Sequence, residues 1–286
     1  MDSVSKKSTI LNITTSLLIA IFIECAFMYL RAISFVLSGI VFFILYSAII
    51  VIIGSRNRRK AVLYAAVFAI VNLTINVTIR TLWWGDTLVS LPEEIMHLLG
   101  IICGVVLVKC PRITRIVIVF IMIALCLVFD RIYIHWLQYL SHNNLTGVVL
   151  EQVNGSPLIE NTDGDTVDIN TMRGSYIVLD CCYTNCSVCI KKLPKIQQLH
   201  EKYNNNPKIQ VYVLFFRLDK ETNKMISEWL SKRGNYSFPI LFGDFNELCA
   251  SLKVSSFPEI IIINPSGEIV FRGRIELAEN YLKQIN

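Results

Sequence analysis

Hydrophobic positions follow two different patterns along the chain. The first 136 residues contain five almost uniformly apolar stretches, whereas short apolar runs alternate with amphipathic segments in the remainder. The stretches cover residues 10–30, 32–53, 61–80, 92–108 and 113–136. The apolar core of a bilayer is about 30 Å thick and takes about 20 helical residues, and backbone groups in lipid must form their hydrogen bonds within the helix. The pattern therefore predicts an α-helical membrane domain of about five transmembrane helices over residues 1–136.

Basic residues predict the orientation of these helices. With a cytoplasmic N-terminus, nine Lys and Arg residues fall in cytoplasmic segments and three in outer segments. The nine are Lys6, Lys7, Arg56, Arg58, Arg59, Lys60, Lys109, Arg112 and Arg115, and the three are Arg31, Arg80 and Arg131. Cytoplasmic loops carry the excess of basic residues in membrane proteins. We therefore predict a multi-pass protein of the cell (inner) membrane, with the C-terminal half in the periplasm or its extracytoplasmic equivalent.

Few ionisable or nucleophilic side chains interrupt the apolar stretches. Glu24 lies near the outer end of the first stretch, and Glu94 and His97 lie near the start of the fourth. An ionisable residue inside a membrane is a functional candidate by default, but all three lie within a turn or two of the interface. The cysteines of this half are Cys25, Cys103, Cys110 and Cys126, and none belongs to a Cys-x-x-Cys pair. We interpret these cysteines as small apolar packing residues.

The remainder of the chain has the pattern of an α/β domain. We predict a linker over residues 137–156 and a domain over residues 157–286, which begins with a hairpin around Asp163-Gly164. Short apolar runs predict strands at 175–182, 208–216, 259–264 and 267–274. Amphipathic segments predict helices at 187–203, 220–234, 246–254 and 276–286, the second of which ends at Gly234. Strands that alternate with helices indicate a mixed sheet with helices on both faces.

Composition supports this division and excludes several classes of protein. Hydrophobic residues make up 53% of the 286 residues and charged residues 17%, against about 25% charged residues in a typical soluble domain. Residues 1–140 contain 12 Lys and Arg against 6 Asp and Glu, whereas residues 141–286 contain 15 against 16. Nucleic acid is not an expected partner, because the basic excess lies outside the half that can fold in water. Nine cysteines in a chain of this length are too few for a disulfide scaffold.

The candidate chemistry lies in the segment Cys186-Ser187-Val188-Cys189, between a predicted strand and a predicted helix. Positions i and i+3 of a helix face the same side, and their separation suits a disulfide. The amides and the dipole at a helix N-terminus stabilise a thiolate, which is the nucleophile of disulfide exchange. Cys186 is therefore placed to attack a disulfide, and Cys189 is placed to resolve the mixed disulfide. The apolar face of this helix is expected to contain Val188, Ile190, Leu193, Ile196 and Leu199.

Other residues stand at informative distances from this pair. Asp180 lies six residues before Cys186 in the preceding strand, and Pro194 lies five residues after Cys189 inside the helix. A proline inside a helix indicates a kink. Pro258 opens a strand directly after Phe257, where a tight bend is compatible with a cis peptide bond.

On these residues, together with the segment Phe238-Pro239-Ile240-Leu241, the region over residues 157–286 resembles the thioredoxin-like TlpA/ResA type of membrane-tethered thiol–disulfide oxidoreductases. The resemblance implies that Cys186 is the nucleophile, Cys189 the resolving thiol, and the two together a redox disulfide. It also implies that Pro258 is a cis-proline that guides the substrate backbone. Asp180 would then be a buried acid–base group whose pKa is raised by burial. Phe257 and Asn185, which precede Pro258 and Cys186, are the expected substrate-binding residues.

Three features depart from the family pattern. Asn185 stands where a tryptophan is usual, and the dipeptide Ser187-Val188 lacks the usual proline. Cys181 and Cys182 occupy strand positions where aromatic residues are common. Strand alternation sends these two side chains to opposite faces of the sheet, so we interpret both, and Cys249 on a later helix, as packing residues.

The expected function is thiol–disulfide exchange outside the cytoplasm, in the direction of reduction, since that compartment is oxidising. The expected partners are a disulfide-bearing client protein, a donor of reductant and the lipid bilayer, with no cofactor and no metal. One alternative is a metal-binding or redox-sensing module that uses the same two cysteines. A second open question is whether the membrane helices are an anchor, which we favour, or pass reductant through Cys25, Cys103 or Cys126.

Overall fold

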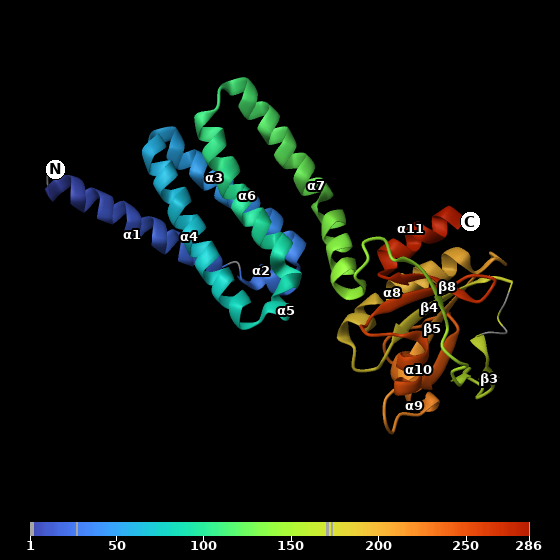
Figure 1. Cartoon of the computed structure of the whole chain (residues 1–286). Coiled ribbons are helices and arrows are strands. Elements are labelled where there is room, and N and C mark those ends of the chain that lie inside the picture. The colour runs from blue at the N-terminus through green and yellow to red at the C-terminus, as the bar shows by residue number, and fades with distance from the viewer. Residues whose placement is uncertain (1–2, 27, 170–171, 173, 286) are drawn as a thin grey trace. The chain divides into compact units, whose positions relative to one another are not determined.

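The computed structural model describes residues 3–26, 28–169, 172 and 174–285, and the chain forms two compact units, Met1–Leu137 and Gln138–Asn286 (Figure 1). The first unit is helical, and the second contains a sheet with helices (Figure 1). This division matches the change from uniformly apolar to alternating patterns along the sequence.

The helical unit contains the long apolar helices that the sequence predicts. Its elements are α1 (Ser3–Ala26), α2 (Met28–Ile33), α3 (Phe35–Arg56), α4 (Arg58–Leu82), α5 (Trp84–Thr87), η1 (Leu88–Ser90), α6 (Leu91–Lys109) and α7 (Arg112–His142). In the described part of the chain, five segments are long and apolar enough to cross a bilayer: Ser8–Ile33, Phe35–Arg56, Arg58–Leu82, Leu88–Lys109 and Arg112–His142. The predicted architecture of this half is confirmed, and these segments are candidate membrane spans by length and composition.

Glycines of α6 allow α3 to approach closely. A Cβ atom on Gly100 would lie 2.5 Å from the carbonyl oxygen of Phe43, and one on Gly104 would lie 2.9 Å from the Cβ of Ile50. Small residues four positions apart are a common means of close helix packing in membranes. Fully buried aromatic and aliphatic side chains at the centre of the unit include Phe42, Tyr46, Ile50 and Phe68.

The second unit is built on one mixed sheet, as predicted. Among the described residues the sheet has eight strands in the order β1-β8-β7-β4-β5-β6-β2-β3. The strands are β1 (Val148–Gln152), β2 (Ile159–Glu160), β3 (Thr166–Val167), β4 (Tyr176–Cys182), β5 (Ile209–Arg217), β6 (Ile240–Asp244), β7 (Glu259–Ile263) and β8 (Glu268–Gly273). Strand β4 lies at the centre, parallel to β5 and antiparallel to β7.

Helices cover both faces of the sheet, and the alternation along β4 decides which side chains face which helices. The helices are α8 (Ser187–Tyr203), α9 (Asn223–Ser231), α10 (Phe245–Leu252) and α11 (Ile275–Ile285). Leu179 and Cys181 pack into the core that also contains Leu248 of α10. Asp180 and Cys182 point to the opposite face, where α8 lies. The sheet therefore holds Asp180 directly beneath the helix that carries the two cysteines.

The structure differs from the predicted elements in several places. Residues 240–244, for which no strand is predicted, form β6 and pair with β5. Residues 148–152, which the sequence analysis assigns to the linker, form β1 and pair with β8 at the sheet edge. The helix predicted at 220–234 begins only at Asn223. Lys220 has a left-handed φ of 71°, and the side chain of Thr222 caps the helix by accepting a hydrogen bond from the backbone N–H of Met225. The helix α9 ends at Ser231 rather than at Gly234.

The buried face of α8 also differs from the predicted one. Its buried residues are Cys189, Lys192, Leu193, Ile196, Leu199 and Tyr203. Val188 is 56% exposed and Ile190 is half-buried. The buried face therefore includes Cys189 and Lys192, while Val188 points toward solvent.

Candidate active site

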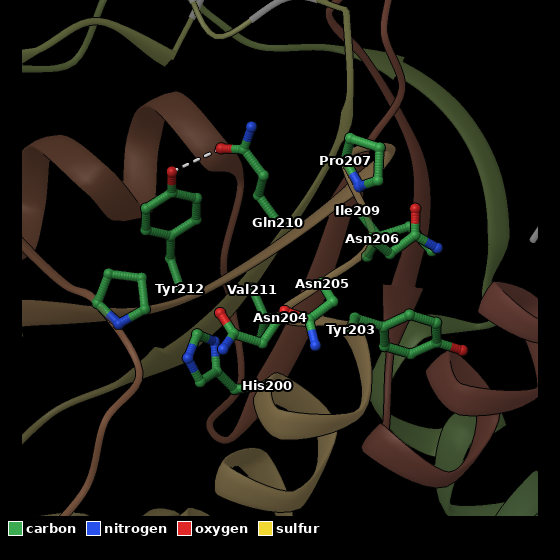
Figure 2. Close-up of a pocket in the computed structure, with 11 residues that line it drawn as sticks. His200, Tyr203, Asn204, Asn205, Asn206, Pro207, Ile209, Gln210, Val211 and Tyr212 are labelled. Atoms are coloured by element: carbon green, nitrogen blue, oxygen red, sulfur yellow. Dashed lines mark hydrogen bonds between the residues drawn. The ribbon is translucent and has the colours of Figure 1, made fainter.

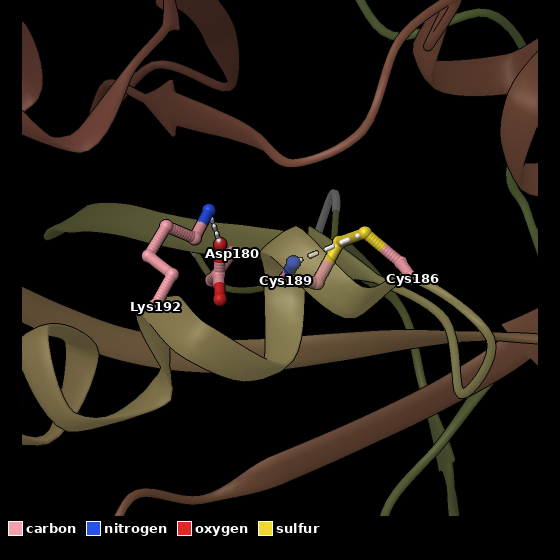
Figure 3. Close-up of a disulfide and its surroundings, with 4 residues drawn as sticks. All are labelled: Asp180, Cys186, Cys189 and Lys192. Carbon is pink, nitrogen blue, oxygen red and sulfur yellow. Dashed lines mark hydrogen bonds and ion pairs between the residues drawn. A yellow bond between two sulfur atoms is a disulfide. The ribbon is translucent and has the colours of Figure 1, made fainter. Parts of the chain in front are cut away.

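Cys186 and Cys189 form a disulfide at the N-terminus of α8, with their Cα atoms 5.2 Å apart (Figure 3). Cys186 is the N-cap residue, and its Sγ accepts a hydrogen bond from the backbone N–H of Cys189 at 3.1 Å. Cys186 is 8% exposed and Cys189 is 1% exposed. Cys186, at the helix terminus, is therefore the more accessible of the two cysteines. After reduction, the amide of Cys189 favours the ionised form of the Cys186 thiol.

The loop with Pro258 packs against the loop that leads to Cys186. The Phe257–Pro258 peptide bond is cis. The ring of Phe257 lies 5.0 Å from that of Tyr183 and 5.7 Å from that of Phe245, between ring centroids. Tyr183 in turn accepts a hydrogen bond from the backbone N–H of Cys186 at 3.1 Å. Aromatic packing thus fixes the proline loop relative to the cysteines, while Asn185 stays exposed beside them.

Asp180 is completely buried and forms an ion pair with Lys192 (Figure 3). Among the residues that the structure describes, Lys192 is the polar partner of this carboxylate, and it is itself buried on α8. Burial raises the pKa of Asp180, and the ammonium of Lys192 opposes this rise without cancelling it. Sequence reasoning missed Lys192; the available signal was a lysine three residues after Cys189, on the same helix face.

A second ion pair lies directly after the cis-proline. Glu259 is 1% exposed, and its Oε1 lies 2.9 Å from Nη1 of Arg272 and 3.2 Å from Nε2 of His142. Nη2 of Arg272 also donates to the backbone carbonyl of Leu252 at 2.6 Å. These contacts anchor the strand after Pro258 to β8 and to the last turn of α7. No feature of the sequence pointed to them.

The other cysteines of this unit are placed as packing residues. Cys181 and Cys182 are buried on opposite faces of β4, and Cys249 is half-buried on α10. Burial raises the pKa of each of these three thiols, so the reactive thiolate form is disfavoured.

In the helical unit, the structure brings Glu24 and His97 into one buried polar cluster. Asn72 Nδ2 lies 3.0 Å from Glu24 Oε1 and 3.0 Å from His97 Nδ1, and Tyr46 donates to Glu24 at 2.6 Å. Glu94 lies outside these contacts and pairs with Arg80 instead, with Nη2 and Oε2 2.6 Å apart.

Glu93 and Arg31 extend the same cluster. Arg31 Nε lies 2.7 Å from Glu93 Oε1, and Arg31 Nη2 lies 3.3 Å from Glu24 Oε2. Glu24 and His97 lie far apart along the chain and meet only when the helices pack, so the sequence alone does not indicate this cluster.

Two cavities in the second unit differ in their relation to the cysteines. One of about 400 Å³ lies at the C-terminal end of α8, lined by residues such as His200, Tyr203 and Gln210 (Figure 2). The disulfide lies at the other end of this helix, so this cavity is separate from the candidate active site. The other, of about 170 Å³, is lined by Pro258 and by Val188, which lies between the two cysteines in the sequence.

Comparison with known proteins agrees with this geometry. A family model described as thioredoxin-like matches residues 174–269. The C-terminal unit contains a thioredoxin-like domain. The match begins just before β4 and therefore includes the cysteine pair, Asp180 and Pro258. The predicted fold class is confirmed for this unit.

The thioredoxin-like domain is homologous to thiol–disulfide oxidoreductases. The thiol–disulfide oxidoreductase ResA of Bacillus cereus is 20% identical over 132 residues, which are 45% of this chain and 73% of the relative. The sporulation thiol–disulfide oxidoreductase A of Bacillus subtilis is 26% identical over 113 residues, which are 39% of this chain and 66% of the relative. The predicted resemblance to this class of enzyme is confirmed.

Solved structures similar to the thioredoxin-like domain include two bacterial proteins. StoA from Bacillus subtilis aligns with a TM-score of 0.39 at 19% identity and covers 46% of this chain and 96% of its own. A thiol:disulfide interchange protein from Bacteroides sp. aligns with a TM-score of 0.41 at 18% identity and covers 48% of this chain and 90% of its own.

Proposed function

We propose that this chain is a membrane-bound thiol–disulfide oxidoreductase that reduces the disulfides of client proteins outside the cytoplasm through Cys186 and Cys189. The observation that carries the proposal is the disulfide at the N-terminus of α8, where the amide of Cys189 donates to the Sγ of Cys186. Homology of the thioredoxin-like domain to oxidoreductases of this class supports it.

The proposed reaction begins with the reduced pair. The thiolate of Cys186 attacks one sulfur of the client disulfide, so that the client S–S bond breaks and a mixed disulfide forms, while the second client sulfur leaves as a thiolate and takes a proton from water. Cys189 then loses its proton and attacks the Sγ of Cys186, which releases the first client sulfur. Two electrons pass to the client, and the Cys186–Cys189 disulfide remains.

Asp180 is the proposed acceptor of the Cys189 proton. It is buried beneath α8, and burial gives it a raised pKa, which makes its carboxylate a stronger base than an exposed one. Pro258, Phe257 and Asn185 are the proposed contacts for the client backbone, and the ring contact of Phe257 with Tyr183 supports this. A donor of reductant, a dithiol by chemical class, must restore the reduced pair after each cycle.

The proposed location follows from the distribution of Lys and Arg. Nine basic residues lie in the segments predicted to be cytoplasmic and three in the outer segments, and cytoplasmic loops carry the excess of Lys and Arg in membrane proteins. This supports a cytoplasmic N-terminus and an extracytoplasmic thioredoxin-like domain.

Two cysteine variants of the full chain test the reaction. We expect Cys186→Ser to abolish exchange with a disulfide-bearing protein, because no nucleophile remains at the helix terminus. We expect Cys189→Ser to accumulate a mixed disulfide between Cys186 and the client, visible by non-reducing electrophoresis and mass spectrometry. Cys249→Ser is the matched control and should exchange normally. Full exchange by Cys186→Ser, or stoichiometric Cu(I) binding by a wild-type chain without exchange, would contradict the proposal.

A further inference from the structure

The cavity beside the cysteine pair is a groove formed by three segments of the second unit. Its lining comprises the first turns of α8, with Val188, Lys191 and Lys195, then the cis-proline Pro258, and finally the residues that begin α11, with Arg274. Val188 lies two residues after Cys186 and is 56% exposed. A client segment that lies along Pro258 and the first turn of α8 would meet these lining residues.

The groove carries more positive than negative charge. Four basic residues line it, Lys191, Lys192, Lys195 and Arg274, against one acidic residue, Glu276. Elsewhere the charges of this half balance, since residues 141–286 contain 15 Lys and Arg against 16 Asp and Glu. The positive charge is therefore a local property of this groove and does not follow from the composition of the domain.

The carboxylates within reach neutralise only part of this charge. Asp180 pairs with Lys192, and Glu276 lies 2.9 Å from Lys195 and 3.9 Å from the Nε of Arg274. Burial favours the protonated form of Glu276, but the hydrogen bond and the charge of Lys195, together with Arg274, outweigh it and hold the pKa of Glu276 below its ordinary value. Two carboxylates thus face four cations.

The remaining charge is accessible to a ligand. Lys191 is exposed, and within the described ranges of the chain no ion pair is formed by it. The side chain of Lys195 is 57% exposed, and that of Arg274 is 34% exposed. The positive end of the α8 dipole adds to the same field. A groove lined by one sign of charge attracts segments of the opposite sign and raises their rate of association.

We propose that this groove selects client segments in which Asp or Glu residues flank the reactive cysteine. The inference rests on the proposed function and specifies the class of client that the site prefers. The carboxylates of such a segment pair with Lys191 and Lys195, while its cysteine lies at Cys186 and its backbone lies along Pro258. The exposed side chain of Val188 provides an apolar contact between these points.

Three peptides test this preference with the full chain in an uncharged detergent. Each peptide contains the same internal disulfide between a fluorophore and a quencher, and the peptides differ only in two Glu, two Gln or two Lys residues beside the cysteine. The second-order rate constant for reduction by the reduced chain is measured for each. We expect the Glu peptide to react about tenfold faster than the Gln peptide at low salt, and the Lys peptide to react more slowly than both.

Salt and side-chain variants identify the groove as the source of the preference. The ratio of the Glu rate to the Gln rate should fall toward one near 1 M salt, where the Debye length is about 3 Å. In the double variant Lys191→Gln/Lys195→Gln the ratio should be close to one even at low salt. Lys202→Gln removes an exposed lysine from the far end of the same helix and should keep the wild-type ratio.

The outcomes separate the two proposals. If none of the three peptides is reduced, the proposed function is wrong. If the Gln peptide is reduced but the Glu peptide is no faster, or if the double variant keeps the preference, the groove does not select acidic clients and the proposed function stands without it.

Discussion

Lys192 lies on the buried face of α8, among mostly apolar side chains. It lies between Cys189 and Leu193 on the buried face, and its ammonium meets the carboxylate of Asp180 on β4. A buried charge requires a partner, so each of the two residues explains the burial of the other. The pair also sets the pH at which Asp180 can accept a proton, because the cation partly offsets the effect of burial.

Replacing Lys192 with Met tests this influence. Without the cation, burial acts on Asp180 unopposed and its pKa rises further. At a pH below its pKa, Asp180 is already protonated and cannot accept the proton of Cys189, so the exchange rate falls on the acid side of the pH profile (its acid limb). This fall should therefore move to higher pH in the variant, by about 1 to 3 pH units. The measurement is the pH dependence of the decay of the mixed disulfide in a single turnover. Asp180→Asn should slow this decay and remove the limb.

Lys202→Met provides the comparison, since Lys202 is exposed on the same helix and does not pair with Asp180. Its acid limb should match that of the wild-type chain. An unmoved limb in Lys192→Met, with normal folding, would show that Asp180 does not accept the Cys189 proton.

Site residues that lie close together in the sequence could be predicted, whereas those brought together by strand pairing could not. Cys186, Cys189 and Asp180 belong to one strand–helix segment, so their spacing alone placed them together. The contacts of Glu259 with Arg272 and His142 join β7 to β8 and to the end of α7. Such contacts depend on strand pairing and on helix ends, which one sequence does not specify.

At the scale of elements, the helix α8 (Ser187–Tyr203) has the bounds that the sequence predicts. Its start is defined by the sequence, because Cys186 caps it. The edge strand β1 was missed, since polar and apolar residue types do not alternate in Val148–Gln152 and its pairing with β8 is interrupted by an irregularity. Helices and strands with a clear capping residue or a strong hydrophobic periodicity can be predicted from the local sequence. Strands such as β1 are defined by their pairing with another strand.

The contact between α3 and α6 gives a prediction at this scale. Gly104→Leu should destabilise the helical unit, because a side chain at this position would begin 2.9 Å from the Cβ of Ile50 and 3.0 Å from the Cα of Ser47. Overpacking of this kind typically lowers the free energy of unfolding by about 1–3 kcal/mol. The measurement is the midpoint of thermal unfolding of the purified chain in detergent.

Gly85→Leu is the matched control, because no atom lies within 4 Å of a Cβ built on Gly85. Its unfolding midpoint should equal that of the wild-type chain. Equal midpoints for both variants would mean that α3 and α6 do not pack as closely as the structure indicates.

At the scale of the whole molecule, the distribution of basic residues predicts which side of the membrane each end occupies. A reporter enzyme that requires disulfides is active only in an oxidising compartment. Fused after Asn286 it should be active, and fused after Asn57, between α3 and α4, it should be inactive. The measurement is reporter activity in intact cells, normalised to the amount of fusion protein.

The reverse pattern would place the thioredoxin-like domain in the cytoplasm and remove the reason to expect net reduction of clients. Hydropathy indicates the two-part organisation, and the orientation stays a prediction from charge. The buried cluster of Glu24, Asn72 and His97 was not, because its members lie on three different helices.

Lys192 both lines the client groove and pairs with Asp180, so one ammonium serves two sites. A docked carboxylate that approaches this ammonium competes with Asp180 for it. Asp180 then attracts a proton more strongly for as long as the client stays bound. Occupancy of the groove thus moves the pKa of Asp180 in the same direction as Lys192→Met, and this one ammonium couples client binding to proton transfer.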